Sequence, residues 1–452
     1  MQRLLIIFAL SLVNFGFSQN PHLISGPMLG YVEHRSALIW LEVDKTVQDV
    51  EIHYWEKDSS QSTKTVKYID ILQQEFNPVR VILTDLKMNT QYEYSIYLEH
   101  SKTTTTFPLT FKTRELWEYR KDPPEFSFVL GSCLYINDSL YDRPGKKYGK
   151  SPKILETMAD QKADFNLWMG DNLYFREADY SSAYGMNYRY SHDRAIPELQ
   201  RLLASRANFA IWDDHDFGPN DSDLSFELKD EAFSLFKKYW GNTSYGERGN
   251  EGVYTKFSYG DAEFFLTDDR MFRSSDRLPD SLNGGPNPDK TFFGKTQLKW
   301  IENALMTSRQ PFKFVVLGGQ VLNPLSKDEC LRHYPVEYNE LINFIVTNRI
   351  SGVIFLTGDR HFSETIGFQP PGFYKILDFT CSPLTSSPYV LNESNPEFLN
   401  PLRVPGTLVM KNNFGKITIS GPKDNRVVRF QTIDAAGDTQ SDFSIKQSEI
   451  KP

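Results

Sequence analysis

The feature that most constrains the fold is an alternation of short apolar segments with amphipathic segments in the second part of the chain. Apolar runs typical of buried strands occupy residues 126–130, 165–169, 209–212, 264–266, 312–317, 352–356 and 427–431. Helical spacing of apolar residues is found at 152–161, 195–207, 296–306 and 337–348. Strands that alternate with helices predict an α/β or α+β layered core.

The first part of the chain has a different pattern. Short alternating segments separated by turn residues lie at 36–41, 50–55, 65–68, 79–83 and 86–94. Such a series predicts an all-β sandwich of the fibronectin type III or immunoglobulin-like kind. Leu86, followed six residues later by Tyr92, resembles the tyrosine corner of these sandwiches. This part contains no cysteine pair and no cluster of catalytic residue types.

The N-terminal residues have the composition of a secretory signal peptide. Arg3 precedes an apolar run of about 14 residues, and small residues at Gly16 and Ser18 suit cleavage after Ser18. A membrane anchor is disfavoured because a span needs about 20 apolar residues. We therefore expect export to the periplasm or the extracellular space, and no transmembrane span in the mature chain.

Residues 115–124 are charged, end in two prolines and are predicted to be a linker. The expected organisation is thus a signal peptide at 1–18, a β-sandwich at 19–114, the linker, and a catalytic domain at 125–452. Two domains also suit the length of 452 residues.

Charge and cysteine content narrow the possibilities further. The net charge of −8 argues against sequence-independent nucleic-acid binding, which needs a basic surface, and no sequence-specific nucleic-acid binding is expected either. An odd number of cysteines leaves at least one without an internal partner. Cys330 and Cys381 form a disulfide or are buried as small apolar residues, and the sequence leaves both alternatives open.

Polar clusters follow directly after four of the predicted strands, where ligand sites of α/β sheets are usually found. These clusters are Gly131–Cys133, Gly170–Tyr174, Asp213–Asp216 with Asn220 just beyond it, and Gly358–His361. The third cluster places three carboxylates within four positions, against an apolar strand. Such carboxylates repel one another and require cations to be tolerated there.

In this order, the four clusters resemble the ligand set of the binuclear metallophosphoesterases. The runs 212–216 and 356–363, supported by 131–133, 268–270 and Gln297, resemble the alkaline phosphatase D (PhoD-like) family. Gly170–Tyr174 also resembles the Asp-x-x-Tyr motif of purple acid phosphatases. The resemblance extends from about residue 25 to the C-terminus, and a β-sandwich in front of the catalytic domain is also that family's arrangement.

The resemblance implies a phosphoric ester hydrolase, an alkaline phosphatase or phosphodiesterase acting on small-molecule or polymeric phosphate esters. It does not separate monoesters from diesters and does not indicate an oligomeric state. The family is often exported through a twin-arginine signal, whereas this chain has only Arg3, so a Sec-type signal is expected.

Two metal ions at such a site hold a hydroxide and neutralise the charge that develops when it attacks the phosphate ester. The predicted metal ligands are Cys133, Asp171, Tyr174, Asp214, Asn220, Asp359 and His361. Asp171 is the predicted bridging ligand. A thiolate and a phenolate suit Fe(III), and oxygen ligands suit Ca2+. The resemblance likewise implies iron with calcium. Zn2+ and Mn2+ are the alternatives.

The remaining roles concern proton transfer and substrate. His215 is the predicted general acid, which protonates the leaving alkoxide. Arg270 is the predicted phosphate clamp, with Arg273 as a weaker candidate, because a guanidinium matches phosphate oxygens. Asp213 and Asp216 are expected to orient His215 or a further cation.

Two other classes of function compete with a phosphoesterase. A glycosidase with paired carboxylates does not need Cys, Tyr and His at strand ends. A non-catalytic exported binding protein built on the β-sandwich would explain residues 21–114 but not the four polar clusters. His192 and His333 lie in less patterned segments, and structural roles are favoured for both over substrate contact.

Overall fold

The computed structural model describes residues 21–327 and 329–452. The predicted signal peptide at 1–18 lies outside the described residues. None of the helices in the described part of the chain combines the length and the apolar character of a membrane span.

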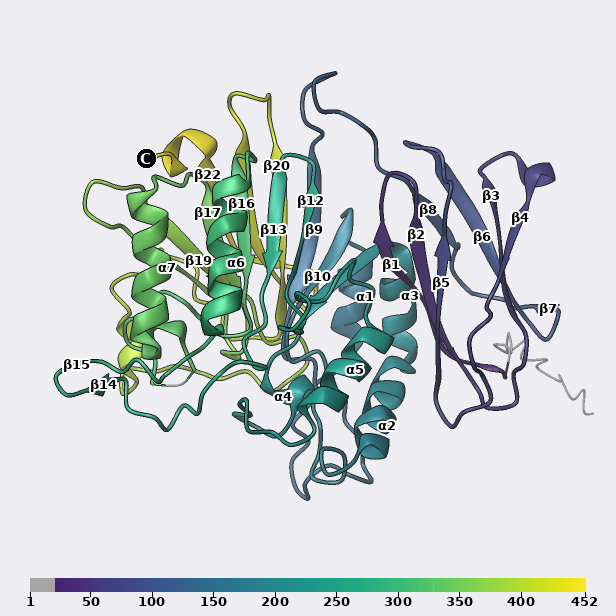
Figure 1. The fold of residues 1–452 in the computed structure, drawn as a ribbon, viewed down its shortest axis with the longest axis horizontal. Coiled ribbons are helices and arrows are strands. Elements are labelled where there is room, and N and C mark those ends of the chain that lie inside the picture. The colour runs from purple at the N-terminus through teal and green to yellow at the C-terminus, as the bar shows by residue number, and fades with distance from the viewer. Residues whose placement is uncertain (1–20, 328) are drawn as a thin grey trace, which may run out of the picture.

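The N-terminal part is a β-sandwich, as predicted (Figure 1). One sheet has the order β1-β2-β5, with β1 (Leu23–Val32), β2 (Ala37–Val43) and β5 (Asn77–Leu83). The other has the order β4-β3-β6-β7, with β8 also paired to β6: β3 (Val50–Glu56), β4 (Lys64–Lys67), β6 (Gln91–Leu98), β7 (Ser101–Lys102) and β8 (Thr110–Lys112). The 3-10 turn η1 (Ser60–Ser62) precedes β4. The hydroxyl of Tyr92 accepts the backbone N–H of Lys87 (2.9 Å), which is the contact expected of a tyrosine corner.

The second part is built on two six-stranded sheets. The first has the order β11-β10-β9-β20-β21-β22, with β9 (Phe126–Gly131), β10 (Phe165–Met169), β11 (Ala207–Ile211), β20 (Asn413–Ser420), β21 (Val427–Asp434) and β22 (Thr439–Lys446). The second has the order β12-β13-β16-β17-β19-β18, with β12 (Thr255–Tyr259), β13 (Ala262–Leu266), β16 (Phe312–Val316), β17 (Val353–Thr357), β18 (Glu364–Phe368) and β19 (Ile376–Thr380). The strands that carry the polar clusters run in parallel: β10 pairs in parallel with β9 and β11, and β17 pairs in parallel with β16 and β19. In each sheet their carboxyl ends therefore share one edge.

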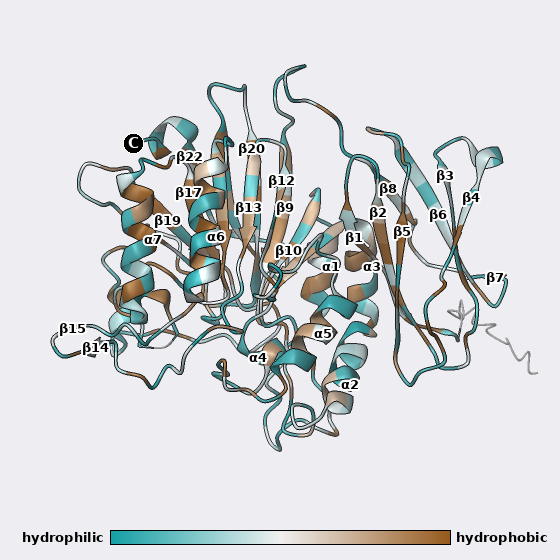
Figure 2. Ribbon diagram, in the orientation of Figure 1, coloured by the Kyte–Doolittle hydropathy of each residue, from teal (hydrophilic) through white to brown (hydrophobic). Residues whose placement is uncertain are grey.

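The two sheets stack through aromatic side chains. The ring of Phe128 lies 5.1 Å from that of Phe264 and 5.6 Å from that of Phe314, and Phe165 lies 5.3 Å from Phe264. Such rings bury large apolar areas and favour edge-to-face contacts. Figures 1 and 2 show the helices on the two outer sides, with their hydrophobic faces turned inward. The architecture is therefore a layered α/β core, as predicted. Its layers follow the order helix, sheet, sheet, helix.

One outer layer contains α1 (Lys153–Ala159), α2 (Ala183–Arg194), α3 (Pro197–Ser205) and α5 (Lys229–Tyr239), and the other contains α6 (Gly294–Thr307) and α7 (Pro335–Thr347). The short elements are α4 (Asp214–Phe217), the hairpin β14 (Ser281–Leu282) with β15 (Gly285–Pro286), and the turns η2 (Leu331–His333), η3 (Pro396–Leu399) and η4 (Gln447–Ile450). The sequence analysis did not predict α2, α5, β12, β18, β19, β20 or β22.

The β-sandwich is joined to the layered core by a buried interface. The indole Nε1 of Trp40 donates to the carbonyl oxygen of Lys238 (2.8 Å), and Asn208 Nδ2 donates to the carbonyl oxygen of Leu29 (2.8 Å). Gly241 approaches the sandwich so closely that a Cβ there would lie 2.4 Å from the Cα of Gly30. Apolar, hydrogen-bonded and backbone contacts together fix the position of the sandwich on the core.

Glu42 at this interface makes stability depend on pH. It is 1% exposed, accepts the hydroxyl of Tyr239 (3.2 Å), and burial raises its pKa to about 7. The folded state therefore holds a proton that the unfolded chain releases nearer pH 4.5, so stability falls as pH rises between these values. We expect Glu42→Gln to remove this fall, a difference of about 2–3 kcal/mol in unfolding free energy. Urea unfolding at mildly acidic and mildly alkaline pH measures the unfolding free energy of both proteins. Glu75→Gln, at an exposed position, is the control. If the stability of Glu42→Gln depends on pH as that of the wild-type protein does, the assignment is contradicted.

Candidate metal centre

The loops after β9, β10 and β17 meet at the shared edge of the sheets. Cys133, Asp171, Asp359 and His361 all have left-handed backbone conformations, with φ of 60°, 50°, 66° and 56°. Non-glycine residues rarely adopt this conformation, and such strain is concentrated at functional sites. Gly358 allows the loops to approach, because a Cβ there would lie 2.4 Å from Ser132 Oγ. The candidate ligands are thus held by backbone geometry that packing enforces.

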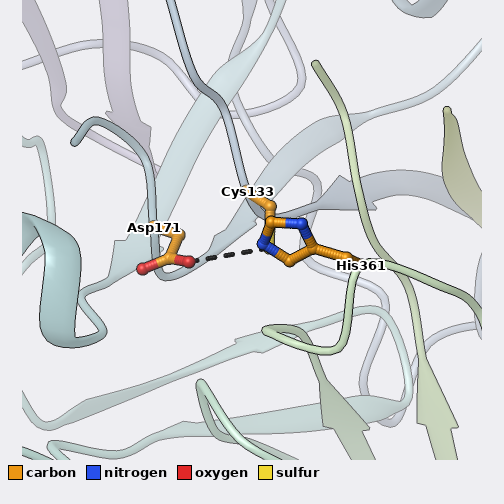
Figure 3. A group of neighbouring side chains, drawn as sticks. All are labelled: Cys133, Asp171 and His361. Carbon is orange, nitrogen blue, oxygen red and sulfur yellow. Dashed lines mark hydrogen bonds between the residues drawn. The ribbon is translucent and has the colours of Figure 1, made fainter. Parts of the chain in front are cut away.

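A thiol, a carboxyl group and an imidazole converge at this edge (Figure 3). Cys133 Sγ lies 3.6 Å from Asp171 Oδ2, and Tyr174 Oη donates to the same oxygen (2.9 Å). Tyr174 Oη is also 3.4 Å from His361 Nε2. Ligand atoms of Cys133, Asp171 and His361 all lie within 4.8 Å of one another. One ion can therefore contact all three residues.

Burial makes the anionic forms of these ligands costly without a cation. It raises the pKa of the Cys133 thiol to about 12 and the pKa values of Tyr174 and Asp171 well above their usual ranges. The neighbouring carboxylates of Asp214 and Asp359 raise the pKa of Asp171 further. A bound cation reverses this effect, since it favours thiolate, phenolate and carboxylate. The donor set thus fits a metal ion.

His361 is oriented from its second ring nitrogen. Its Nδ1 lies 2.9 Å from the carbonyl oxygen of Ser387, which accepts a hydrogen bond from the Nδ1–H group and so favours the tautomer with the Nε2 lone pair directed at the centre. Tyr148 Oη lies 3.2 Å from the same Nδ1. Asp359 approaches the centre through its backbone, because its carbonyl oxygen accepts the Cys133 thiol (3.5 Å).

A second group of ligand atoms shares Asp171. Asp171, Asp214 and His215 each place one ligand atom within 4.8 Å of the others. Asp214 begins α4, and its Oδ2 accepts the backbone N–H of Asp221 (2.7 Å). Asn220 is exposed and lines a cleft that Tyr174 and His215 also line. Since Asp171 belongs to both groups, its two oxygens can serve two ions.

Asp216 is a support for the loops. Its carboxylate accepts the backbone N–H groups of Asp171 (3.2 Å), Asn172 (3.2 Å) and Asp213 (2.6 Å). Asn172 Nδ2 adds a further bond to it (2.6 Å). Asp216 therefore ties the β10 loop to the β11 loop, whereas the prediction was that it orients His215 or a further cation.

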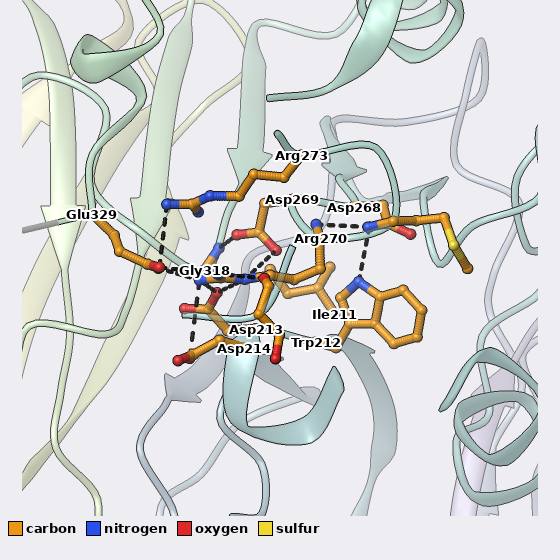
Figure 4. A network of polar contacts seen from close by, with 12 residues as sticks. Ile211, Trp212, Asp213, Asp214, Asp268, Asp269, Arg270, Arg273, Gly318 and Glu329 are labelled. Carbon is orange, nitrogen blue, oxygen red and sulfur yellow. Dashed lines mark hydrogen bonds and ion pairs between the residues drawn. The ribbon is translucent and has the colours of Figure 1, made fainter. Parts of the chain in front are cut away.

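Arg270 lies in a buried ion-pair network (Figure 4). Its guanidinium contacts Asp213 Oδ1 through Nε (2.7 Å) and Glu329 Oε1 through Nη1 (3.0 Å). Arg273 pairs with Glu329 (3.2 Å) and Asp276 (2.8 Å). Both arginine side chains are at most 1% exposed. The structure thus gives both guanidinium groups carboxylate partners, with no opening to solvent, and the phosphate-clamp role stays a prediction. The sequence analysis missed Glu329, which stands in an unpatterned loop.

His215 lines a cleft of about 920 Å³, together with Tyr174, Asn220 and Tyr148. Its side chain is 21% exposed and its ring lies 4.1 Å from that of Tyr174. Burial lowers the pKa of His215, and the Asp214 carboxylate opposes that shift. An anionic ligand in the cleft favours the protonated imidazole for the same electrostatic reason.

His192, His333, Cys330 and Cys381 do not belong to either group of ligand atoms. His192 pairs with Asp193 (2.7 Å) and His333 with Asp280 (2.8 Å). Cys330 and Cys381 are free and buried, so the disulfide alternative is wrong.

The chain was compared with known protein families, curated proteins and solved structures. A family model described as PhoD-like phosphatase matches residues 145–443, and one described as a domain of unknown function matches residues 20–113. Alkaline phosphatase D of Bacillus subtilis (strain 168) is 26% identical over 313 residues, which is 59% of this chain and 51% of that protein. The chain thus spans about half the length of this curated relative.

Solved structures show the same fold. The structure of PhoD superposes with a TM-score of 0.77 at 17% identity, covering 96% of this chain and 92% of the other. A purple acid phosphatase from yellow lupin (Lupinus luteus) seeds superposes with a TM-score of 0.62 at 13% identity, covering 93% and 74%. Both likenesses extend over the β-sandwich and the layered core.

Proposed function

Because the chain belongs to the PhoD-like phosphatase family, we propose that it is an exported, metal-dependent phosphoesterase that hydrolyses phosphate mono- or diesters. The observation that supports this proposal most is the convergence of Cys133, Asp171, Tyr174 and His361 at one sheet edge. In this proposal residues 125–452 are the catalytic domain, residues 19–114 are the sandwich and residues 1–18 are removed on export.

Two ions suit the two groups of ligands that share Asp171. Cys133, Tyr174 and His361 would hold Fe(III), and Asp214, with Asn220 and Asp359, would complete an oxygen-rich site for Ca2+; Zn2+ or Mn2+ would be the alternatives. When bound, the ions supply positive charge that offsets the charge developing on the phosphoryl oxygens.

The protein's own residues provide position and a proton. Asp171 accepts Tyr174 Oη on Oδ2 and the backbone N–H of His215 on Oδ1 (3.4 Å), so both oxygens are held in place. His215 lines the cleft and can donate a proton to the departing alcohol oxygen. Asp216 keeps the loops that carry these residues in register.

The test measures metal content and activity on the same sample of the mature protein. Elemental analysis, a visible spectrum, and assays with a chromogenic phosphomonoester and phosphodiester are made before and after chelation. Iron with calcium, activity that chelation removes, and a visible charge-transfer band that Tyr174→Phe removes are the expected results. Zinc or manganese with activity would keep the reaction but overturn the thiolate and phenolate roles. A folded protein that is metal-free and inactive after correct assembly would contradict the proposal.

His215 has its own prediction, which depends on the leaving group. We expect His215→Ala to lower kcat by about a hundredfold for alkyl phosphate esters, because an alkoxide needs a proton as it departs. The loss should be much smaller for p-nitrophenyl esters, whose leaving group departs without one. Steady-state kinetics on the two ester types measures the difference, with His192→Ala as the control variant. Equal losses on both types would argue for a binding role.

A further inference from the structure

A run of positive charge lies on one wall of the catalytic cleft. Residues 143–150 contain Arg143, Lys146, Lys147 and Lys150 and no carboxylate, in a chain whose net charge is −8. The first three of these side chains line the same cleft as Tyr174 and His215.

The carboxylates that line this cleft are already paired. Asp142 accepts Arg176 Nε (3.0 Å), and Glu177 accepts Arg143 Nε (2.7 Å). Lys146 and Lys147 are exposed, and neither forms an ion pair with a residue in the described part of the chain. The cleft wall therefore has two positive charges in excess, and they belong to these two lysines.

The segment that carries the lysines is anchored at the metal centre. Tyr148, which follows Lys147 directly, places its hydroxyl 3.2 Å from His361 Nδ1, and Ser387 Oγ donates to its carbonyl oxygen (2.7 Å). Its ring also lies 6.3 Å from that of Tyr174. The segment that carries the two lysines is thus fixed beside the centre where the scissile phosphate would bind, and both lysines line the cleft.

We propose that Lys146 and Lys147 form a subsite for a second phosphate group, carried by the alcohol portion of the substrate. This inference rests on the proposed phosphoesterase function. A second phosphate brings about two further negative charges, which two uncompensated cations attract, while the rest of a net-negative surface repels them. The preferred substrates are then esters of phosphorylated alcohols, such as bisphosphates, and not esters of neutral alcohols.

The experiment compares two non-hydrolysable ligands that differ only in the second charged group. Isothermal titration of the metal-loaded mature protein with propylphosphonate and with propane-1,3-bisphosphonate gives both affinities. We expect the bisphosphonate to bind about tenfold more tightly, or about 1.4 kcal/mol, because two exposed charge pairs add to its binding. The double variant Lys146→Ala/Lys147→Ala should abolish this preference and leave propylphosphonate binding nearly unchanged. Lys57→Ala/Lys102→Ala removes two exposed charges from the sandwich and is the matched control.

Each outcome decides a different point. Chelation of the metals by the bisphosphonate is unaffected by the lysine substitutions, so a preference that survives them would overturn the subsite. Equal binding of the two ligands to the wild-type protein would also overturn it, without affecting the proposed function. If the wild-type protein binds neither ligand, the phosphate site itself is contradicted. Higher ionic strength should reduce the preference, because the lysines are exposed.

Discussion

Replacement of Asp171 by asparagine is expected to lower kcat/KM for phosphate esters by at least about a thousandfold. Asp171 is the residue that both groups of ligand atoms share, so its loss affects both ions at once. Asparagine has nearly the same shape but no charge, and its amide nitrogen cannot bind a cation. We therefore expect the protein to lose bound metal together with activity, which elemental analysis and the chromogenic assays measure in parallel.

The same substitution should make the metal-free protein more stable. Asp171 is buried, and the carboxylates around it raise its pKa well above the usual range, so removing its charge relieves repulsion. Thermal unfolding in the presence of a chelator tests this point, with the exposed Asp160→Asn as the control. A variant that loses activity and also unfolds more easily would show that Asp171 is a structural residue. A variant that keeps its metals would show that it is not the bridge.

The candidate site was predictable because its residues come directly after buried strands. Cys133, Asp171 and Asp214 follow β9, β10 and β11, and parallel pairing brings these strand ends together. The core was predictable for the same reason, since β10, β16 and β17 are short apolar runs buried along their whole length. Local sequence is sufficient to predict the position of a residue when that position depends only on the strand to which the residue belongs.

The helix α2 could not be predicted because its buried face is polar. Arg189 and Asp193 are buried there, and Arg189 pairs with Asp179 (2.8 Å) and with Asp193 (3.2 Å). An apolar repeat of 3.6 residues is therefore missing, and the buried charges also need a partner outside the helix, Asp179. The same holds for Glu329 in the metal centre's ion-pair network, whose partners Arg270 and Arg273 lie far away in the sequence. Long-range pairing of charges leaves no periodic pattern in the sequence.

Replacement of Arg270 by methionine is expected to lower the unfolding free energy by about 3–5 kcal/mol. Arg270 is fully buried and compensates Asp213, which is 1% exposed, and Glu329, which is 11% exposed. Arg270 and Arg273 hold the pKa of Glu329 well below its usual range, so this carboxyl group is ionised in the folded protein. Methionine fills similar space but leaves Asp213 without its guanidinium partner and Glu329 with Arg273 alone, and the cost of a buried unpaired charge is large.

Urea unfolding of the chelator-treated protein measures this loss, because it removes any contribution from bound metal. Arg35→Met is the matched control: its ion pair with Asp85 is 72% and 78% exposed, so it should cost less than about 1 kcal/mol. Adding Glu329→Gln to Arg270→Met should recover a substantial part of the stability, since one of the stranded charges is then gone. If the double variant is no more stable than Arg270→Met, the loss comes from packing around the side chain and not from charge. Recovery would instead show that Arg270 stabilises the fold by compensating the buried charge of Glu329.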